Sequence, residues 1–70
     1  MQFEEKLFKV AENDGWRLTL HEVGPFFRVS EWSASSDEID NYYYESGVEA
    51  LQKFLELDAY ANEEGHAQQT

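Results

Sequence analysis

The chain has 70 residues, with 15 acidic residues against five Lys and Arg, and its formal net charge at pH 7 is −10. Its length allows one small domain, and its hydrophobic content of 41% is too high for a disordered acidic tail. The absence of cysteine excludes a disulfide framework and a thiolate metal site. The short apolar runs and the acidic N-terminal residues predict neither a membrane span nor a signal peptide, so we expect a cytoplasmic protein.

The first predicted element is an amphipathic helix over residues 3–12. Its apolar residues, including Leu7 and Val10, recur at helical spacing, and two glutamates lie in the first turn. Gly15 follows an Asn-Asp pair and suits the left-handed conformation found after many helix ends. We therefore expect the helix to stop at this point.

Three strands are predicted next. Residues 16–21 alternate between apolar and polar side chains, which is the period of a half-buried strand. Gly24-Pro25 marks a turn, after which Phe27 and Val29 continue the alternation on a second strand. Residues 39–45 are rich in β-forming side chains and predict the third strand.

A second helix is predicted over residues 47–61, with Ser46 as its cap and Glu49 completing a capping box. Its apolar arc is wide enough to pack on another helix or on a second copy of the chain, which allows a homodimer. Residues 62–70 predict a frayed tail. The expected fold is α+β, a single domain over residues 1–61 with a three-stranded antiparallel sheet flanked by two helices, in the order αβββα.

Acidic residues are concentrated in the second half of the chain. Residues 36–70 contain nine acids and one base, whereas residues 1–35 contain six acids and four bases. Five acids and no base lie between residues 37 and 49: Asp37, Glu38, Asp40, Glu45 and Glu49. This asymmetry indicates an interaction surface, and the alternative is an acidic surface that serves solubility alone.

Catalysis is not expected from this sequence. His21 is predicted on the solvent side of a strand and His66 in the tail, and neither belongs to a recognisable catalytic constellation. The acidic stretch that begins at Asp37 lacks the spacing of an EF-hand loop. We therefore expect a protein that is not an enzyme and that uses no cofactor or metal.

The hypothesis that follows is mimicry of nucleic acid. Glu38 and Asp40 lie on one side of their predicted strand, and Glu45 and Glu49 extend the row of carboxylates into the helix. Such a row can replace phosphates in a groove lined with Arg and Lys, while direct binding to nucleic acid is disfavoured by the charge. Tyr42 and Tyr44 add aromatic contact area to this predicted partner-binding site.

In size, predicted order and acidity, the chain resembles the small phage-encoded anti-CRISPR proteins. The stretch that carries this resemblance runs from Asp37 to Glu45 and includes three consecutive tyrosines. The resemblance implies a DNA mimic that occupies the DNA-binding groove of a CRISPR effector in the host cytoplasm. Inhibition of a type I complex, type I-C in particular, is the specific expectation, with the five acids facing basic residues of the effector.

Two alternatives remain open. Three strands followed by the segment from Ser46 to Leu51 resemble HicB-like antitoxin domains, which neutralise a basic RNase toxin. The predicted N-terminal helix departs from that pattern. The other alternative is a small adaptor or oligomerisation domain, in which Trp32 and Phe26 form an exposed aromatic patch on the sheet.

Overall fold

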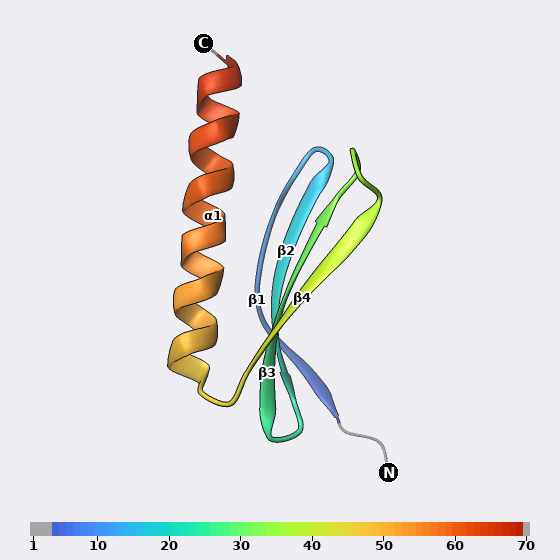
Figure 1. The fold of residues 1–70 in the computed structure, drawn as a ribbon, viewed down its shortest axis with the longest axis vertical. Helices are drawn as coiled ribbons and strands as arrows, with labels where there is room; N and C mark the ends of the chain where they lie inside the picture. The colour runs from blue at the N-terminus through green and yellow to red at the C-terminus, as the bar shows by residue number, and fades with distance from the viewer. Residues whose placement is uncertain (1–3, 70) are drawn as a thin grey trace.

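A computed structural model describes the backbone of residues 4–69 and the side chains of residues 4–61. Four strands are followed by one helix, and the helix lies along one face of the sheet (Figure 1). The C-terminal end of the helix runs past the ends of the strands. The elements are β1 (Glu5–Asn13), β2 (Trp16–Val23), β3 (Phe26–Ser33), β4 (Glu38–Tyr44) and α1 (Gly47–Gln69).

The sheet is an antiparallel meander in the order β1-β2-β3-β4, so β1 and β4 are its edge strands. Two-residue turns connect β1 to β2 and β2 to β3. Gly15 has φ +84° in the first turn and Gly24 has φ +59° in the second, a region that glycine enters without steric cost. A longer turn joins β3 to β4, and there Asp37 has φ +54°.

Alternation along the strands gives the sheet two different faces. Leu18, Leu20 and Val29 point toward α1 and form the buried core with Ala50 and Phe54 of the helix. The residues between them point to the opposite side, which no element among residues 4–69 covers and which we call the open face. The open face carries Glu5, Leu7, Val10, Glu12, Arg17, Thr19, His21, Val23, Phe26, Arg28, Ser30, Trp32, Ile39, Asn41 and Tyr43.

Close packing fixes where α1 begins. A Cβ atom at Gly47 would lie 3.2 Å from the ring of Phe27, so the glycine lets the first turn approach β3. Phe54 is fully buried further along the helix, and the ammonium group of Lys9 lies 5.6 Å from its ring centroid. The helix is therefore held over the middle strands, while β1 is exposed almost throughout.

The predicted αβββα fold is wrong, because the chain has a four-stranded sheet and a single helix in the order ββββα. Residues 5–12 of the segment predicted as a helix lie in β1, Glu4 precedes the strand, and Phe3 lies outside the described residues. A β-bulge between Leu7 and Lys9 shifts the alternation and brings Leu7 and Val10 to the same face. This three-residue spacing imitates that of a helix.

The other predicted elements correspond to observed ones. Residues 16–21 lie in β2, Phe27 and Val29 lie in β3, and residues 39–44 lie in β4. The helix begins at Gly47, directly after the predicted cap, and continues through residues 62–69, where the sequence predicted a frayed tail. Within the described residues, no helix is both long enough and apolar enough to cross a membrane.

Candidate acidic interaction surface

The edge strand β4 directs its acidic residues toward the helix side of the sheet. Glu38 and Asp40 alternate with Ile39 and line a cavity together with Tyr60 of α1. Both carboxylates are exposed, because this part of β4 lies beyond the buried core. The alternation of a strand therefore separates the acids of β4 from its apolar residues.

The side of α1 that faces β4 is also acidic. The ammonium group of Lys53 lies 4.8 Å from the ring centroid of Tyr42, which places this side of the helix against β4. Glu49 and Glu56 precede and follow Lys53 by four and three residues, so all three share one side of the helix. Lys53 and Glu56 form an ion pair with Nζ and Oε1 3.7 Å apart.

These observations define an acidic flank beside β4 and α1, in which Lys53 is the basic residue. Asp37 lies next to the flank, at the turn before β4, and all the carboxylates of the flank are exposed. The other four bases lie on β1, β2 and β3. The acidic flank consists of Glu38 and Asp40 of β4, Glu45 in the connection between β4 and α1, and Glu49 and Glu56 of α1.

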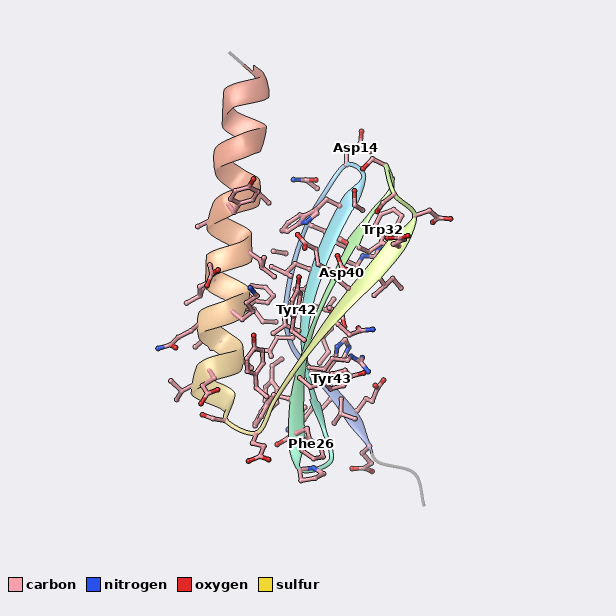
Figure 2. All side chains as sticks on the ribbon, in the orientation of Figure 1. Asp14, Phe26, Trp32, Asp40, Tyr42 and Tyr43 are labelled. Atoms are coloured by element: carbon pink, nitrogen blue, oxygen red, sulfur yellow. The ribbon has the colours of Figure 1, made fainter. Side chains whose placement is uncertain are left out.

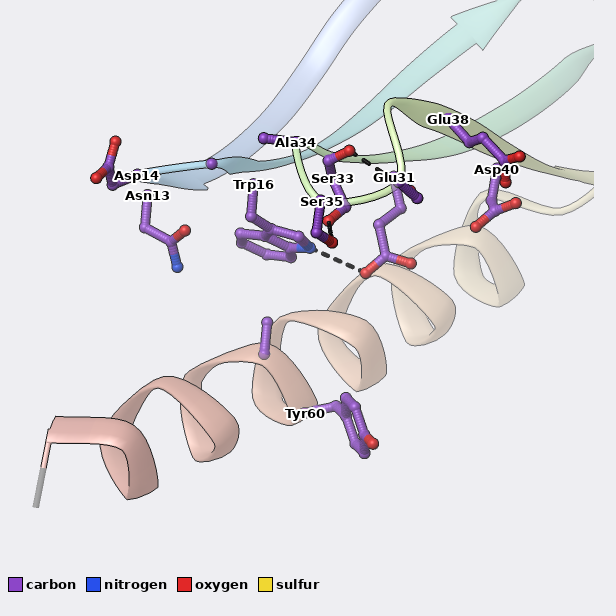
Figure 3. A pocket seen from close by; sticks show the side chains of 13 residues that line it. Asn13, Asp14, Trp16, Glu31, Ser33, Ala34, Ser35, Glu38, Asp40 and Tyr60 are labelled. Carbon is purple, nitrogen blue, oxygen red and sulfur yellow. Dashed lines mark hydrogen bonds between the residues drawn. The ribbon is translucent and has the colours of Figure 1, made fainter.

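A cavity of about 550 Å³ separates the C-terminal half of α1 from the end of the sheet (Figure 3). The indole N–H of Trp16 donates a hydrogen bond of 2.9 Å to Oε2 of Glu31 there. Asp40 is paired directly opposite Glu31 in the sheet, so two like charges face each other on adjacent strands. Within the described residues, no group of three acidic or histidine side chains has the arrangement needed to hold a metal ion.

The predicted site residues divide into two groups. Glu38, Asp40, Glu45 and Glu49 lie on the acidic flank, and Asp37 lies next to it. Figure 2 shows Tyr42 on the side of β4 that faces the helix, and both Tyr42 and Tyr44 pack against the core. Both residues are half-buried, so they present less area to a partner than fully exposed side chains would.

Sequence reasoning missed Glu56 and emphasised the tyrosines. Glu56 follows Glu49 by seven residues, and this spacing returns a side chain to the same side of a helix. The exposed ring belongs to Tyr43, which is 62% exposed and lies on the open face. Three tyrosines in a row cannot share one face, and the core contacts decide which two point toward the helix.

A network of polar side chains crosses the open face around Arg28. Its guanidinium donates to Oε1 of Glu5 at 2.6 Å and to Oγ of Ser30 at 3.0 Å. Its third nitrogen lies 3.4 Å from Nδ1 of His21. Desolvation lowers the pKa of His21 below 6.5, the Arg28 charge lowers it further, and Glu5 opposes the shift.

The chain has two histidines. His21 lies on the solvent side of β2, as the alternation predicted, and its ring lies beside the guanidinium of Arg28. The side chain of His66 lies outside the described side chains. The expectation that the protein is not an enzyme stays a prediction.

Comparison with protein-family models, with curated proteins and with solved structures found no match. The resemblances to anti-CRISPR proteins and to HicB-like antitoxins therefore stay predictions. Of the features that carried the first resemblance, size and acidity remain, whereas the αβββα order does not. Similarity to known proteins shows no family for this chain.

Proposed function

We propose that this protein inhibits a nucleic-acid-binding protein by occupying its basic groove with the acidic flank. The observation that carries the proposal is the gathering of five exposed carboxylates around β4 and α1 with one base among them. Positive surface is the common requirement of proteins that grip phosphates. An anionic surface on a chain with a net charge of −10 fits such a groove and is steered toward it.

The spacing of the carboxylates suits this role. Glu38 and Asp40 are two residues apart on one strand, which corresponds to about 6.6 Å, or twice the rise of about 3.4 Å per nucleotide in a DNA strand. Glu49 and Glu56 are seven residues apart on the helix, which corresponds to about 10.5 Å, or three such rises. Carboxylates accept bidentate hydrogen bonds from arginine, as phosphates do.

Repulsion between like charges at the acidic flank lowers the stability of the fold, and this cost supports a role in binding. Asp40 lies opposite Glu31 in the sheet, and like charges in such pairs destabilise it. The ring of Tyr42 and the Lys53 ammonium lie between the two acidic elements and hold them at a fixed separation. Residues that lower the stability of the fold are expected on a surface that serves to bind a partner.

A CRISPR effector is the partner class we propose, because such an effector holds its DNA in a positively charged channel. The resemblance to small anti-CRISPR proteins points to a type I complex, with type I-C as the first to test. The proposal places the protein in the cytoplasm of a host cell. Bound in the channel, the flank would exclude target DNA without any chemical step.

The HicB-like antitoxin is the second candidate, and one observation favours it. The N-terminal segment is the strand β1, so the helix that departed from the antitoxin pattern is not present. A meander of strands followed by α1 agrees better with that pattern than the predicted order did. The mechanism is the same, with a basic RNase in place of the effector.

A competition assay tests the proposal with two variants of equal charge. Glu38→Gln, Asp40→Asn and Glu49→Gln together neutralise the acidic flank, and Glu4→Gln, Glu12→Gln and Glu22→Gln together neutralise three acids elsewhere. Each combination changes the net charge from −10 to −7. The measured quantity is the concentration of protein that displaces labelled DNA from a type I effector, or that inhibits a basic RNase toxin of the kind that HicB-like antitoxins neutralise.

The flank variant is expected to lose at least about 100-fold in potency, because several charge-assisted hydrogen bonds disappear together. The control variant is expected to stay within a few fold of the unmodified protein. Equal losses in both variants would show that bulk charge is responsible and would contradict the proposal. Binding to the effector without displacement of DNA would also contradict it, and activity against the RNase alone would assign the antitoxin role.

A further inference from the structure

The open face is an apolar surface without a cover among the described residues. Its largest exposed side chains include Ile39 at 61%, Tyr43 at 62% and Phe26 at 41%, and Figure 2 shows Tyr43 pointing away from the helix. Leu7 and Val10 add apolar area from the edge strand β1. Exposed apolar patches of this extent on a small domain mark contact sites.

The open face is also electrically neutral, unlike the rest of the molecule. Arg17 pairs with Glu12 at 2.9 Å, and Arg28 pairs with Glu5 at 2.6 Å. Two positive and two negative charges cancel, so the net charge of −10 lies outside this face when His21 is neutral. Two copies of a strongly acidic chain therefore repel each other least when they meet through their open faces.

The polar groups at the centre of the open face are already paired with one another. Arg28 contacts Glu5 of β1, His21 of β2 and Ser30 of β3, and the Ser30 hydroxyl donates to Oδ1 of Asn41 on β4 at 2.7 Å. The network thus spans all strands of the sheet. Side chains that satisfy each other lose little when a partner displaces water from them.

We propose that a second copy of this chain covers the open face, so that two sheets pack face to face in a symmetric dimer. Strands of eight residues at about 3.3 Å per residue, four of them at about 4.8 Å, give roughly 500 Å² per copy. The pair would bury about 1,000 Å², which is the lower limit for a specific interface. A hollow of about 500 Å³ between Arg17 and Trp32 can receive a side chain of the second copy.

This dimer goes beyond the proposed inhibitor function and does not depend on it. The acidic flank lies beside α1, on the side of the sheet opposite the contact, so both flanks stay accessible. Dimerisation is measured on the protein alone, whereas inhibition is measured with a partner. Failure of one proposal is therefore distinguishable from failure of the other.

Sedimentation equilibrium and light scattering of the full chain test the proposal. The expected mass is twice the chain mass of 8.2 kDa, and the dimer should persist at about 1 M NaCl, where the Debye length is only about 3 Å. Ile39→Lys with Tyr43→Lys should raise the dissociation constant by about 30-fold or more. The matched control is Val48→Lys with Leu55→Lys, which adds the same two charges on exposed helix positions.

Circular dichroism establishes that each variant is folded. If the lysine pair unfolds, Ile39→Thr with Tyr43→Thr replaces it, because threonine keeps the strand preference while removing apolar area. A monomeric unmodified protein at millimolar concentration would overturn the proposal and assign the open face to a different occupant. A dimer that the helix control dissociates, and the open-face variants do not, would overturn it as well.

Discussion

The acidic flank and the open face lie on opposite sides of one strand and differ in nearly every respect. Along β4, Glu38 and Asp40 point toward the helix side, whereas Ile39 and Tyr43 point to the open face. The flank has five carboxylates and one base, while the open face pairs each of its arginines with a glutamate. The period-two geometry of a strand thus divides one short sequence into an anionic surface and a neutral apolar one.

The largest expected effect is the loss of both surfaces through Phe54→Ala. Phe54 is fully buried between α1 and the sheet, and its truncation should lower the free energy of unfolding by about 3–5 kcal/mol. A loss of that size is a large fraction of the stability of a domain this small. Chemical denaturation followed by circular dichroism measures it.

Leu55→Ala is the matched control, because Leu55 is the next residue and is 48% exposed. Its effect should be well below that of Phe54→Ala. Equal effects would mean that α1 is not held by the core contact with β2 and β3. The acidic flank would then not be a fixed arrangement of β4 against α1.

A smaller effect is expected from Arg28→Met, which acts on the open face alone. The Arg28 side chain is 20% exposed and bonds to groups on three strands, so its loss should cost about 1–3 kcal/mol of unfolding free energy. Arg17→Met is the control, because Arg17 is 61% exposed and such surface pairs contribute about 0–1 kcal/mol. Similar losses from both, measured by urea denaturation, would contradict the network.

Part of this fold was predictable from the sequence and part was not. The strand around Leu18 and the helix after Ser46 follow from clear periodicity and a capping pattern. The strand β1 was missed because its bulge places Leu7 and Val10 at a helical interval. The Asp14-Gly15 pair is also typical of two structures, the end of a helix and the turn of a β-hairpin. Only the pairing of β1 with β2 decides between them.

The candidate site was predictable in its acids and not in its aromatics. The carboxylates from Glu38 to Glu49 were found because a base-free run is visible in the sequence. The positions of Tyr42 and Tyr44 depend on which side of β4 the helix covers, and that is a long-range contact. Glu56 belongs to the acidic flank only because the side of α1 that carries Lys53 faces β4.

Asp40→Asn, on the acidic flank, is expected to stabilise the fold, whereas the substitutions above destabilise it. It removes the repulsion between Asp40 and Glu31 and should stabilise the fold by about 0.2–1 kcal/mol. The same change should weaken inhibition of the partner, because a carboxylate of the flank is lost. Thermal denaturation gives the first quantity and the competition assay gives the second.

Asp37→Asn is the control for that change. Asp37 lies outside the paired strands with φ +54°, a conformation that Asn also tolerates, so its stability should hardly change. If Asp40→Asn destabilises the protein, the opposing carboxylates are not in conflict. The electrostatic support for a binding role would then be lost.

The smallest expected effect is a pH dependence that originates on the open face. The pKa of His21 is lowered in the folded protein, first by desolvation and then by the charge of Arg28, so the unfolded chain takes up its proton at higher pH. Its stabilising contribution is therefore complete above pH 6.5 and is lost as the pH falls from there through the folded pKa. The unmodified protein must be compared with His21→Gln at each pH, so that the contribution of His21 is isolated.

Gln is a suitable replacement because its amide oxygen can accept from Arg28 as the neutral ring does. The stability advantage of the unmodified protein over His21→Gln should shrink between pH 7.5 and pH 5, measured as the difference in denaturation midpoints. A constant difference would mean that His21 is protonated equally in both states, with the charge of Glu5 offsetting both the desolvation and the charge of Arg28. If the second copy covers the open face, burial of His21 deepens, and the same shift should be larger at protein concentrations that favour the dimer.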